Sequence, residues 1–156
     1  MNQNKTVLTK EQKQEFMEWI RNFLHNPRIL VMATASDNRP YCNLMCFAST
    51  QECSIIVVTP RDTSKYTNLT QNNLVSVLIT DSEEKAGIGN TTAITINGRA
   101  NEVGEKERKK LADIFIAKYP ELQDFVYSET SALFRIDPVA IVSPEDFYQV
   151  KEVHFE

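Results

Sequence analysis

The residues from 59 to 69 carry the side-chain types best suited to binding a phosphate. A helix that begins here would present unpaired backbone N–H groups and the positive end of its dipole to an anion. Hydroxyl groups would donate further hydrogen bonds, and cationic side chains would add positive charge. The candidate ligands in this segment are Thr59, Arg61, Thr63, Ser64 and Lys65.

A purely structural interpretation of the same segment is also open. Asp62 or Thr63 would then cap the helix, and Ser64 and Thr67 would be local turn residues. Arg61 and Lys65 would be solvated surface charges. Hydroxyl-rich helix starts are common, so the segment alone does not decide between the two interpretations.

Strands must position this segment, because it lies between two short apolar and β-branched runs, 54–59 and 74–80. Turn residues at 37–40 and 50–53 divide the preceding chain into a hairpin and the strand that follows it. Residues 97–98 predict a bend within a long later strand. The other predicted strands are 28–36, 41–49, 91–103, 132–142 and a short one around 147–150.

Helices are predicted at both sides of the strand-rich region. Thr9 and Gln12 form a capping-box pattern that opens a helix ending at 26–27. A second helix covers 105–118, and Pro120 separates it from a short helical piece containing Leu122 and Phe125. Apolar residues at helical spacing predict core contacts for both helices. These residues are Phe16, Trp19, Ile20, Phe23 and Leu24 in the first helix, and Leu111, Ile114 and Phe115 in the second.

The order of elements predicts one mainly β domain with flanking helices over residues 1–156, with residues 1–9 flexible. Tight turns between short strands favour an antiparallel barrel or sandwich. A dinucleotide-binding α/β fold is disfavoured, because β-α-β alternation is missing. The glycines around Ile88 lack the third glycine and the following helix of a dinucleotide fingerprint.

The composition excludes several function classes. The net charge of −4, with charges of both signs interspersed, argues against a general nucleic-acid surface. The polar N-terminus and the lack of long apolar runs lead us to expect a cytoplasmic protein. We find no zinc spacing, and we expect His25 and His154 in capping or surface positions rather than as heme ligands.

Three cysteines are present, and no CxxC pair occurs among them. Cys42 and Cys46 lie four residues apart on a predicted strand, so they share a face at a distance too long for a disulfide. A role as reactive thiols is open for these two residues, but we interpret them as small buried hydrophobic side chains. The third cysteine is Cys53.

Taken together, the motifs resemble the pyridoxamine 5′-phosphate oxidase-like, FMN-binding split-barrel superfamily. The resemblance covers most of the chain, from about residue 16 to 150. Its most specific parts are the hairpin at 31–41 and the segment 59–69, and the runs 71–77 and 94–100 also match.

The resemblance implies a six-stranded antiparallel Greek-key split barrel that forms a homodimer, with FMN in a groove at the dimer interface. By position, Thr63, Ser64 and Lys65 would hold the FMN phosphate, with Thr59 beside them. Arg61 would supply further positive charge. The flavin ring would lie along the strand at Asn43, Leu44, Met45 and Cys46, contacting backbone groups, and Thr92 would reach the flavin from a neighbouring strand.

Two departures from the family pattern bear on function. Relatives often carry arginine at the positions of Asn43 and Ser64, which leaves this chain with less positive charge. The C-terminus also lacks the arginine- and histidine-bearing segment that grips the substrate phosphate in true pyridoxamine phosphate oxidases. Vitamin B6 oxidation is therefore not our first hypothesis.

The sequence predicts an FMN-dependent oxidoreductase that acts on an unknown small substrate. No pair of titratable side chains stands out as an acid–base team, so no catalytic residue and no metal site is predicted. The alternatives are a flavin binder or electron carrier without its own substrate, or a protein that uses the same barrel for the deazaflavin F420 or for heme.

Overall fold

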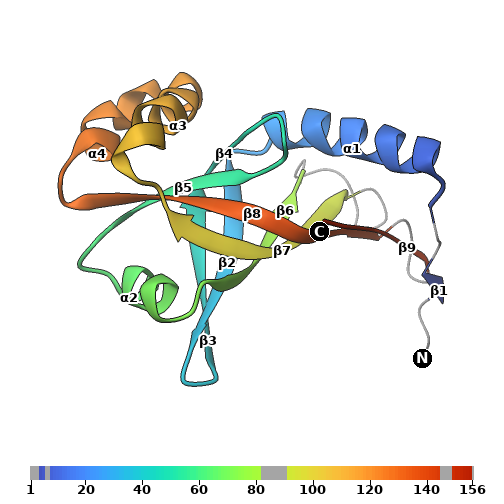
Figure 1. Ribbon diagram of the computed structural model, residues 1–156, viewed down its shortest axis with the longest axis horizontal. Helices are drawn as coiled ribbons and strands as arrows, with labels where there is room; N and C mark the ends of the chain where they lie inside the picture. Colours follow the sequence, from blue (N-terminus) through green and yellow to red (C-terminus); the bar gives the residue numbers. More distant parts are fainter. Residues whose placement is uncertain (1–3, 6–7, 82–90, 145–148, 156) are drawn as a thin grey trace.

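A strongly curved antiparallel sheet runs through the protein, whose computed structural model describes residues 4–5, 8–81, 91–144 and 149–155 (Figure 1). Helix α1 lies along one side of the sheet, α3 and α4 lie together at one end, and α2 lies beside the β2–β3 hairpin. The strands are β1 (Asn4–Lys5), β2 (Ile29–Ser36), β3 (Arg39–Cys46), β4 (Ala48–Ser49), β5 (Ile55–Pro60), β6 (Leu74–Thr80), β7 (Ala93–Glu102), β8 (Ser131–Pro144) and β9 (Gln149–His154). The helices are α1 (Lys10–His25), α2 (Ser64–Gln71), α3 (Glu105–Lys118), the 3₁₀ turn η2 (Pro120–Leu122) and α4 (Gln123–Tyr127).

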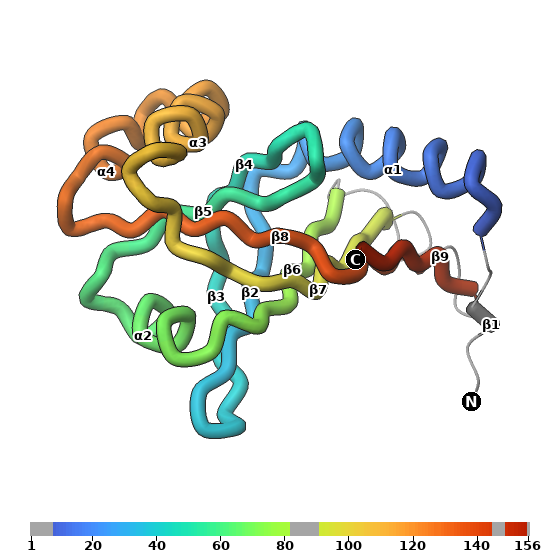
Figure 2. The backbone as a smooth tube through the Cα atoms, viewed as in Figure 1, coloured from blue at the N-terminus to red at the C-terminus, as the bar shows by residue number. Residues whose placement is uncertain are grey.

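The strand order is β1-β9-β8-β7-β6-β2-β3, with β5 paired to β8 and β4 paired to β5. Every pairing is antiparallel except that of β1 with β9. Among the described strands no ladder joins β3 to β5, so the barrel is split there and β3 has a free edge. The predicted six-stranded antiparallel split barrel is thereby confirmed in β2, β3 and β5 to β8. Figure 2 traces the chain through the β2–β3 hairpin.

Helix α1 begins where the sequence predicts. The side chain of Thr9 accepts a hydrogen bond from the backbone N–H of Gln12 at 3.2 Å, and the Gln12 side chain accepts one from the Thr9 N–H at 2.9 Å. Phe16, Ile20 and Leu24 are buried against the sheet. The prediction for Trp19 is wrong, because this side chain keeps 39% of its surface exposed.

Trp19 lies at the margin of the apolar face of α1 rather than at its centre. It stacks between Phe16 and Phe23, with ring centroids 5.7 and 5.5 Å away. Helical spacing alone does not separate the centre of an apolar stripe from its edge, which explains the wrong prediction.

The β2–β3 hairpin has a tighter turn than the sequence indicates. Asp37 and Asn38 both adopt positive φ, and pairing continues up to Ser36 and Arg39, so the loop contains two residues. The returning strand is also shorter than the predicted 41–49. It ends at Cys46, because the buried Phe47 directs its backbone to the hydroxyl of Tyr119 instead of to β2.

The predicted bend in β7 is confirmed as an irregularity between Asn97 and Gly98. The register with β8 shifts there, which leaves Val139 as the extra residue. A Cβ atom at Gly98 would lie 2.6 Å from the carbonyl oxygen of Asp137, so the close approach of the strands requires glycine. Strand β9 reaches further than the predicted 147–150, while residues 147–148 and the loop glycines around Ile88 lie outside the described residues.

Two buried clusters hold the elements together. The larger cluster fills the barrel and the space under α1, and the smaller one joins α3 and α4 to β5 and β8. Leu111 and Phe115 are buried as predicted, and Ile114 is partly buried at the margin of the smaller cluster. Part of the segment predicted to be flexible, Asn4–Lys5, forms β1.

Candidate functional site

The start of α2 is fixed by hydroxyl groups of the preceding residues. Thr63 is the N-cap, and its Oγ1 accepts a hydrogen bond from the Tyr66 N–H at 3.3 Å. The same hydroxyl donates to the carbonyl oxygen of Pro60 at 2.9 Å and lies 3.1 Å from the hydroxyl of the fully buried Thr59. The capping role considered for Thr63 is therefore confirmed, and the hydroxyls of both threonines already have partners within the protomer.

Each of the three guanidinium nitrogens of Arg61 contacts another group of the protein. Its Nη2 lies 2.6 Å from Glu102 Oε1, its Nη1 donates to the Tyr66 hydroxyl at 3.0 Å, and its Nε donates to the Glu129 carbonyl at 3.4 Å. The hydrogen bond to Glu102 raises the pKa of Arg61 above its ordinary value. Arg61 thus ties the connection between β5 and α2 to the end of β7, instead of being a free surface charge.

Ser64 and Lys65 differ from these neighbours, because their polar groups have no partner in the described part of the chain. Ser64 is exposed and Lys65 is partly buried. The cap of α2 engages the N–H groups of Tyr66 and Thr67, which leaves those of Ser64 and Lys65 as the free donors of the first turn. Two N–H groups, one hydroxyl and one ammonium are therefore the donors that α2 offers to an anion.

Helix α2 packs beside the β2–β3 hairpin. The Asn68 side chain donates to the buried hydroxyl of Thr34 at 3.1 Å, and the Ser36 hydroxyl donates to the side chain of Gln71 at 2.8 Å. Thr34 pairs with Tyr41, two residues before Asn43 on β3. The fold thus places the second half of α2, the helix that the predicted phosphate segment opens, against the hairpin that carries the predicted ring-contacting strand.

Alternation along β3 sends its four candidate residues to two different faces. Asn43 and Met45 point into the barrel, while Leu44 and Cys46 point outward. The amide nitrogen Nδ2 of Asn43 is buried and has no hydrogen-bond partner in the structure. An unpartnered buried donor is costly, so this position suits a ligand that supplies an acceptor.

The backbone of β3 supplies further unpaired groups. Because the hairpin turn has two residues, the N–H and C=O groups of Asn43 and Met45 face β2, and those of Leu44 and Cys46 face the open edge. No described strand covers this edge. A flat polar ligand could therefore bind along it, as the family resemblance implies.

Thr92 lies far from the other candidates within one protomer. It precedes β7 and exchanges hydrogen bonds with Asp81, at the opposite end of the strand from Glu102. Ten residues of strand span about 30 Å. The structure therefore does not bring Thr92 together with the start of α2.

An exposed apolar surface on the outside of the sheet was not predicted. Val31 pairs with both Leu44 and Leu78, so these three side chains share the outer face, where Leu44 keeps 66% of its surface exposed. A shallow hollow of about 430 Å³ lies on this face near Leu74 and Val139. The signal in the sequence was the run 29–33, which is apolar at both odd and even positions and so predicts burial of both faces.

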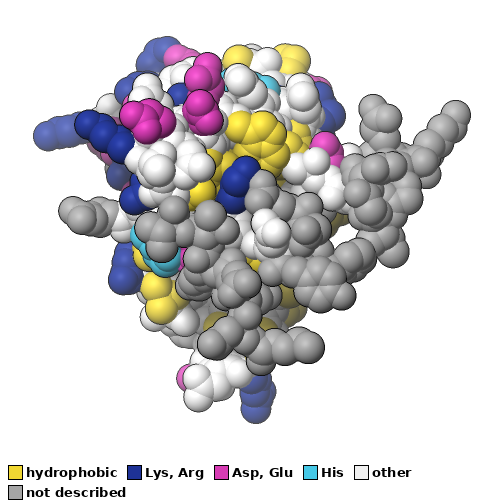
Figure 3. Space-filling view, turned by 90° about the vertical axis from the view of Figure 1, so that its right-hand side faces the viewer, with side chains coloured by type: hydrophobic (Ala, Val, Ile, Leu, Met, Phe, Trp, Pro, Cys, Tyr) yellow, Lys and Arg dark blue, Asp and Glu magenta, His cyan; other side chains and the backbone are white. Residues whose placement is uncertain are grey.

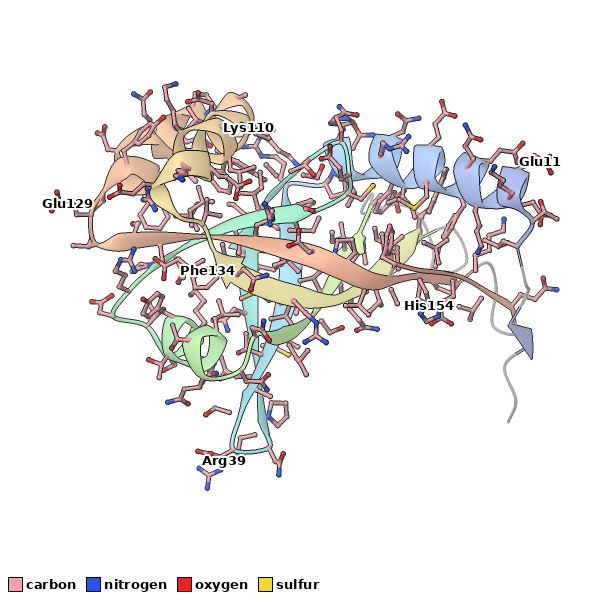
Figure 4. The ribbon with its side chains drawn as sticks, in the orientation of Figure 1. Glu11, Arg39, Lys110, Glu129, Phe134 and His154 are labelled. Carbon is pink, nitrogen blue, oxygen red and sulfur yellow. The ribbon has the colours of Figure 1, made fainter. Side chains whose placement is uncertain are left out.

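The remaining titratable and thiol groups form no second site in the described residues. Cys42 is exposed, which corrects its prediction as a buried residue, whereas Cys46 is partly buried and Cys53 is buried. Burial raises the pKa of the Cys53 thiol. His25 is exposed, and His154 lies on β9 with its Nε2 2.8 Å from Glu152 (Figure 4).

Metal-binding and membrane-spanning features are not found within the described ranges. No group of three or more His, Cys, Asp or Glu side chains gathers there in a way that would hold a metal ion. None of the described helices is both long and apolar enough to cross a membrane. Charged side chains of both signs lie on the face seen in Figure 3, in keeping with the mixed charge of the sequence.

Comparison with solved structures identifies the fold. A heme binding protein from Mycobacterium smegmatis superposes with a TM-score of 0.80 at 9% identity, over 96% of this chain and 60% of the other. The heme storage protein HutZ from Vibrio cholerae gives 0.68 at 21% identity, over 78% of this chain and 88% of the other. An FAD-binding protein from Mesorhizobium loti gives 0.64 at 19% identity, over 81% and 91%. At these identities the likeness shows the fold alone.

The sequence comparison shows the family. Residues 16–143 match the model of the family described as pyridoxamine 5′-phosphate oxidase. A comparison with curated proteins gave no match. The match spans nearly all of the split barrel, and the chain therefore belongs to the pyridoxamine 5′-phosphate oxidase-like split-barrel family.

Proposed function

We propose that the chain binds the flavin cofactor FMN, with the phosphate at the start of α2 and the ring system along the free edge of β3. The observation that carries this proposal is the grouping of unpartnered donors at one end of the barrel. Ser64 and Lys65 lie on α2, and the buried Nδ2 of Asn43 lies on the adjoining hairpin. Family membership supports the same position.

The proposed phosphate cradle is smaller than the sequence predicted. Ser64 and Lys65 supply its donors, because the hydroxyls of Thr59 and Thr63 are hydrogen-bonded to each other and within the α2 cap. Arg61 is engaged by Glu102. Asn43 would donate to an acceptor on the ribityl chain or the phosphate, and so replace part of the contact that arginine makes in relatives.

We further propose that the complete site needs a second copy of this chain. The outer face carries several large exposed apolar side chains, and monomeric proteins rarely leave such a surface uncovered. A homodimer that covers it would resemble the isologous pairs common among soluble proteins. In such a dimer Thr92 would reach the flavin from the partner, which the distance within one protomer does not allow.

Bound FMN would supply hydride or single-electron transfer, so an oxidoreductase that acts on a small substrate is the activity we favour. The chain would contribute binding and orientation. Lys65 would neutralise the phosphate, and the N–H groups along the β3 edge would interact with polar atoms of the ring. The described residues offer no acid–base pair for a second substrate, so a flavin-binding electron carrier is the alternative.

The direct test is a titration of the purified protein with FMN, followed by flavin fluorescence and absorbance. We expect saturable binding with one FMN per chain. Failure to saturate at any accessible concentration would contradict the proposal. Parallel titrations with F420 and heme test those alternatives. Heme is included because two of the fold neighbours are named as heme proteins.

The dimer is tested separately by sedimentation velocity. Leu44→Glu places a charge on the outer apolar face and should produce monomers that bind FMN weakly. Tyr127→Glu, an exposed position on α4, is the matched control and should stay dimeric. A wild-type chain that sediments as a monomer while it binds FMN would overturn the shared site.

A further inference from the structure

Glu102, at the end of β7, meets the connection between β5 and α2 and uses both of its carboxylate oxygens there. Oε1 lies 2.6 Å from Arg61 Nη2, and Oε2 accepts a hydrogen bond from the Tyr66 hydroxyl at 3.3 Å. We propose that Glu102 determines how strongly the site selects for a phosphorylated ligand, because it neutralises Arg61 beside the phosphate cradle. The inference rests on the proposed function and concerns the same site.

The charges around the cradle show why one carboxylate matters. The α2 connection carries the cations Arg61 and Lys65 and the exposed anion Asp62, so Glu102 brings the local sum to zero. A phosphate monoester carries about −1.5 to −2 at neutral pH. The side-chain charges around the cradle therefore do not balance those of such a ligand, and Lys65 is the single cation in residues 59–71 without a described counter-ion.

Geometry places Arg61 close enough to influence the ligand. It precedes Ser64 by three residues, and its Nη1 contacts Tyr66, which lies in the first turn of α2. Its side chain is 40% exposed, and that of Glu102 is 32% exposed. An ion pair this exposed contributes little to folding stability, so its main effect is to cancel two charges at the entrance of the site.

The test compares FMN with riboflavin, which lacks the phosphate, in the wild type and in Glu102→Gln. Glutamine keeps the size and an acceptor oxygen but removes the charge. We expect FMN to bind about three- to fivefold more tightly to the variant at low salt. This gain is the Coulomb attraction between the freed Arg61 charge and a phosphate about 8 Å away in a water-like dielectric. Riboflavin affinity should stay unchanged, and the gain should shrink at high salt.

The double variant Arg61→Gln/Glu102→Gln is the matched control and should return the FMN-to-riboflavin ratio to its wild-type value. A purely structural role of Glu102 would change the affinities for both ligands in parallel. That result, an unchanged ratio, or a gain that persists in the double variant would overturn the inference. Wild-type protein that binds no FMN would instead overturn the proposed function, so the two failures are distinguishable.

Discussion

Polar groups are paired differently in two regions of the molecule, the junction between α1 and α3 and the start of α2. At the junction the Tyr119 hydroxyl donates to the carbonyl oxygen of Arg28, and also lies 2.9 Å from that of Phe47. The Lys118 ammonium donates to the Pro27 carbonyl at 2.6 Å and lies 4.2 Å from the ring centroid of Phe47. Every one of these groups has a partner within the protomer.

At the start of α2, by contrast, the side-chain donors of Ser64 and Lys65 have no described partner, and neither has the side-chain Nδ2 of Asn43 on β3. A folded chain normally pairs its buried polar groups, so the unpaired, buried Nδ2 of Asn43 supports the binding role that we propose for the free donors of α2. The junction serves stability, whereas we propose that the start of α2 serves a ligand. Variants that affect one region without the other are the way to test this comparison.

The largest expected effect on stability lies in the α3 region. Phe115 is 1% exposed, and its ring lies 4.9 Å from that of Tyr119. Phe115→Ala should lower the free energy of unfolding by about 3–5 kcal/mol, measured by urea denaturation. Phe115→Leu, which keeps most of the volume, should cost less. If Phe115→Leu lost as much free energy of flavin binding as free energy of unfolding, the two regions would not act independently.

On α1 the expected effects differ between neighbouring residues. Ile20 is fully buried, so Ile20→Ala should cost about 2–5 kcal/mol. Trp19→Ala should cost less, about 1–2 kcal/mol, because part of this side chain is already in water and its described ring contacts are the two stacked phenylalanines. Chemical denaturation of both variants measures the difference, and equal losses would contradict the marginal position of Trp19.

A smaller effect is expected from the titration of Lys118. Burial and the nearby Arg28 lower its pKa to about 8, below the ordinary value of about 10.4. Between these two values the unfolded chain binds more protons than the folded chain, so the contribution of this group to stability rises with pH. From pH 8 to 10.5 the wild type should gain about 1 kcal/mol relative to Lys118→Met, since the half-buried site is partly screened.

Parallel denaturation series at several pH values measure this gain. Lys110→Met, at an exposed position on α3, is the control and should follow the wild type throughout. Wild-type and Lys118→Met profiles that stay parallel would show that the carbonyl oxygens and the Phe47 ring hold the ammonium as well as water does.

The sequence predicts the fold where local and global preferences agree. The capping box at Thr9, the helix 105–118, the strand 74–80 and the bend at Gly98 all appear as predicted. The family motifs extend this agreement between prediction and structure to the whole barrel. Errors arise where a tertiary contact decides the outcome, as with the Tyr119 hydroxyl that ends β3 early.

The candidate site is predictable in position but not in its details. Residue types at 59–65 locate a candidate phosphate segment, yet they do not show that Arg61 is held by Glu102, which is 41 residues away in the chain. The exposed apolar face was not predicted, for a related reason. Helical and strand periodicity indicate that a face is apolar, but not whether the chain itself or a second copy covers it.

The proposed function requires that the uncommitted donors at the start of α2 bind the phosphate of a flavin. Its most direct test measures the dissociation constants of FMN and riboflavin for the wild type and for Lys65→Gln. We expect Lys65→Gln to weaken the binding of FMN about tenfold and to leave the affinity for riboflavin unchanged. The free energy of unfolding should stay within about 0.5 kcal/mol of the wild type. FMN affinity that is insensitive to Lys65, or equal affinities of the wild type for FMN and riboflavin, would contradict the claim.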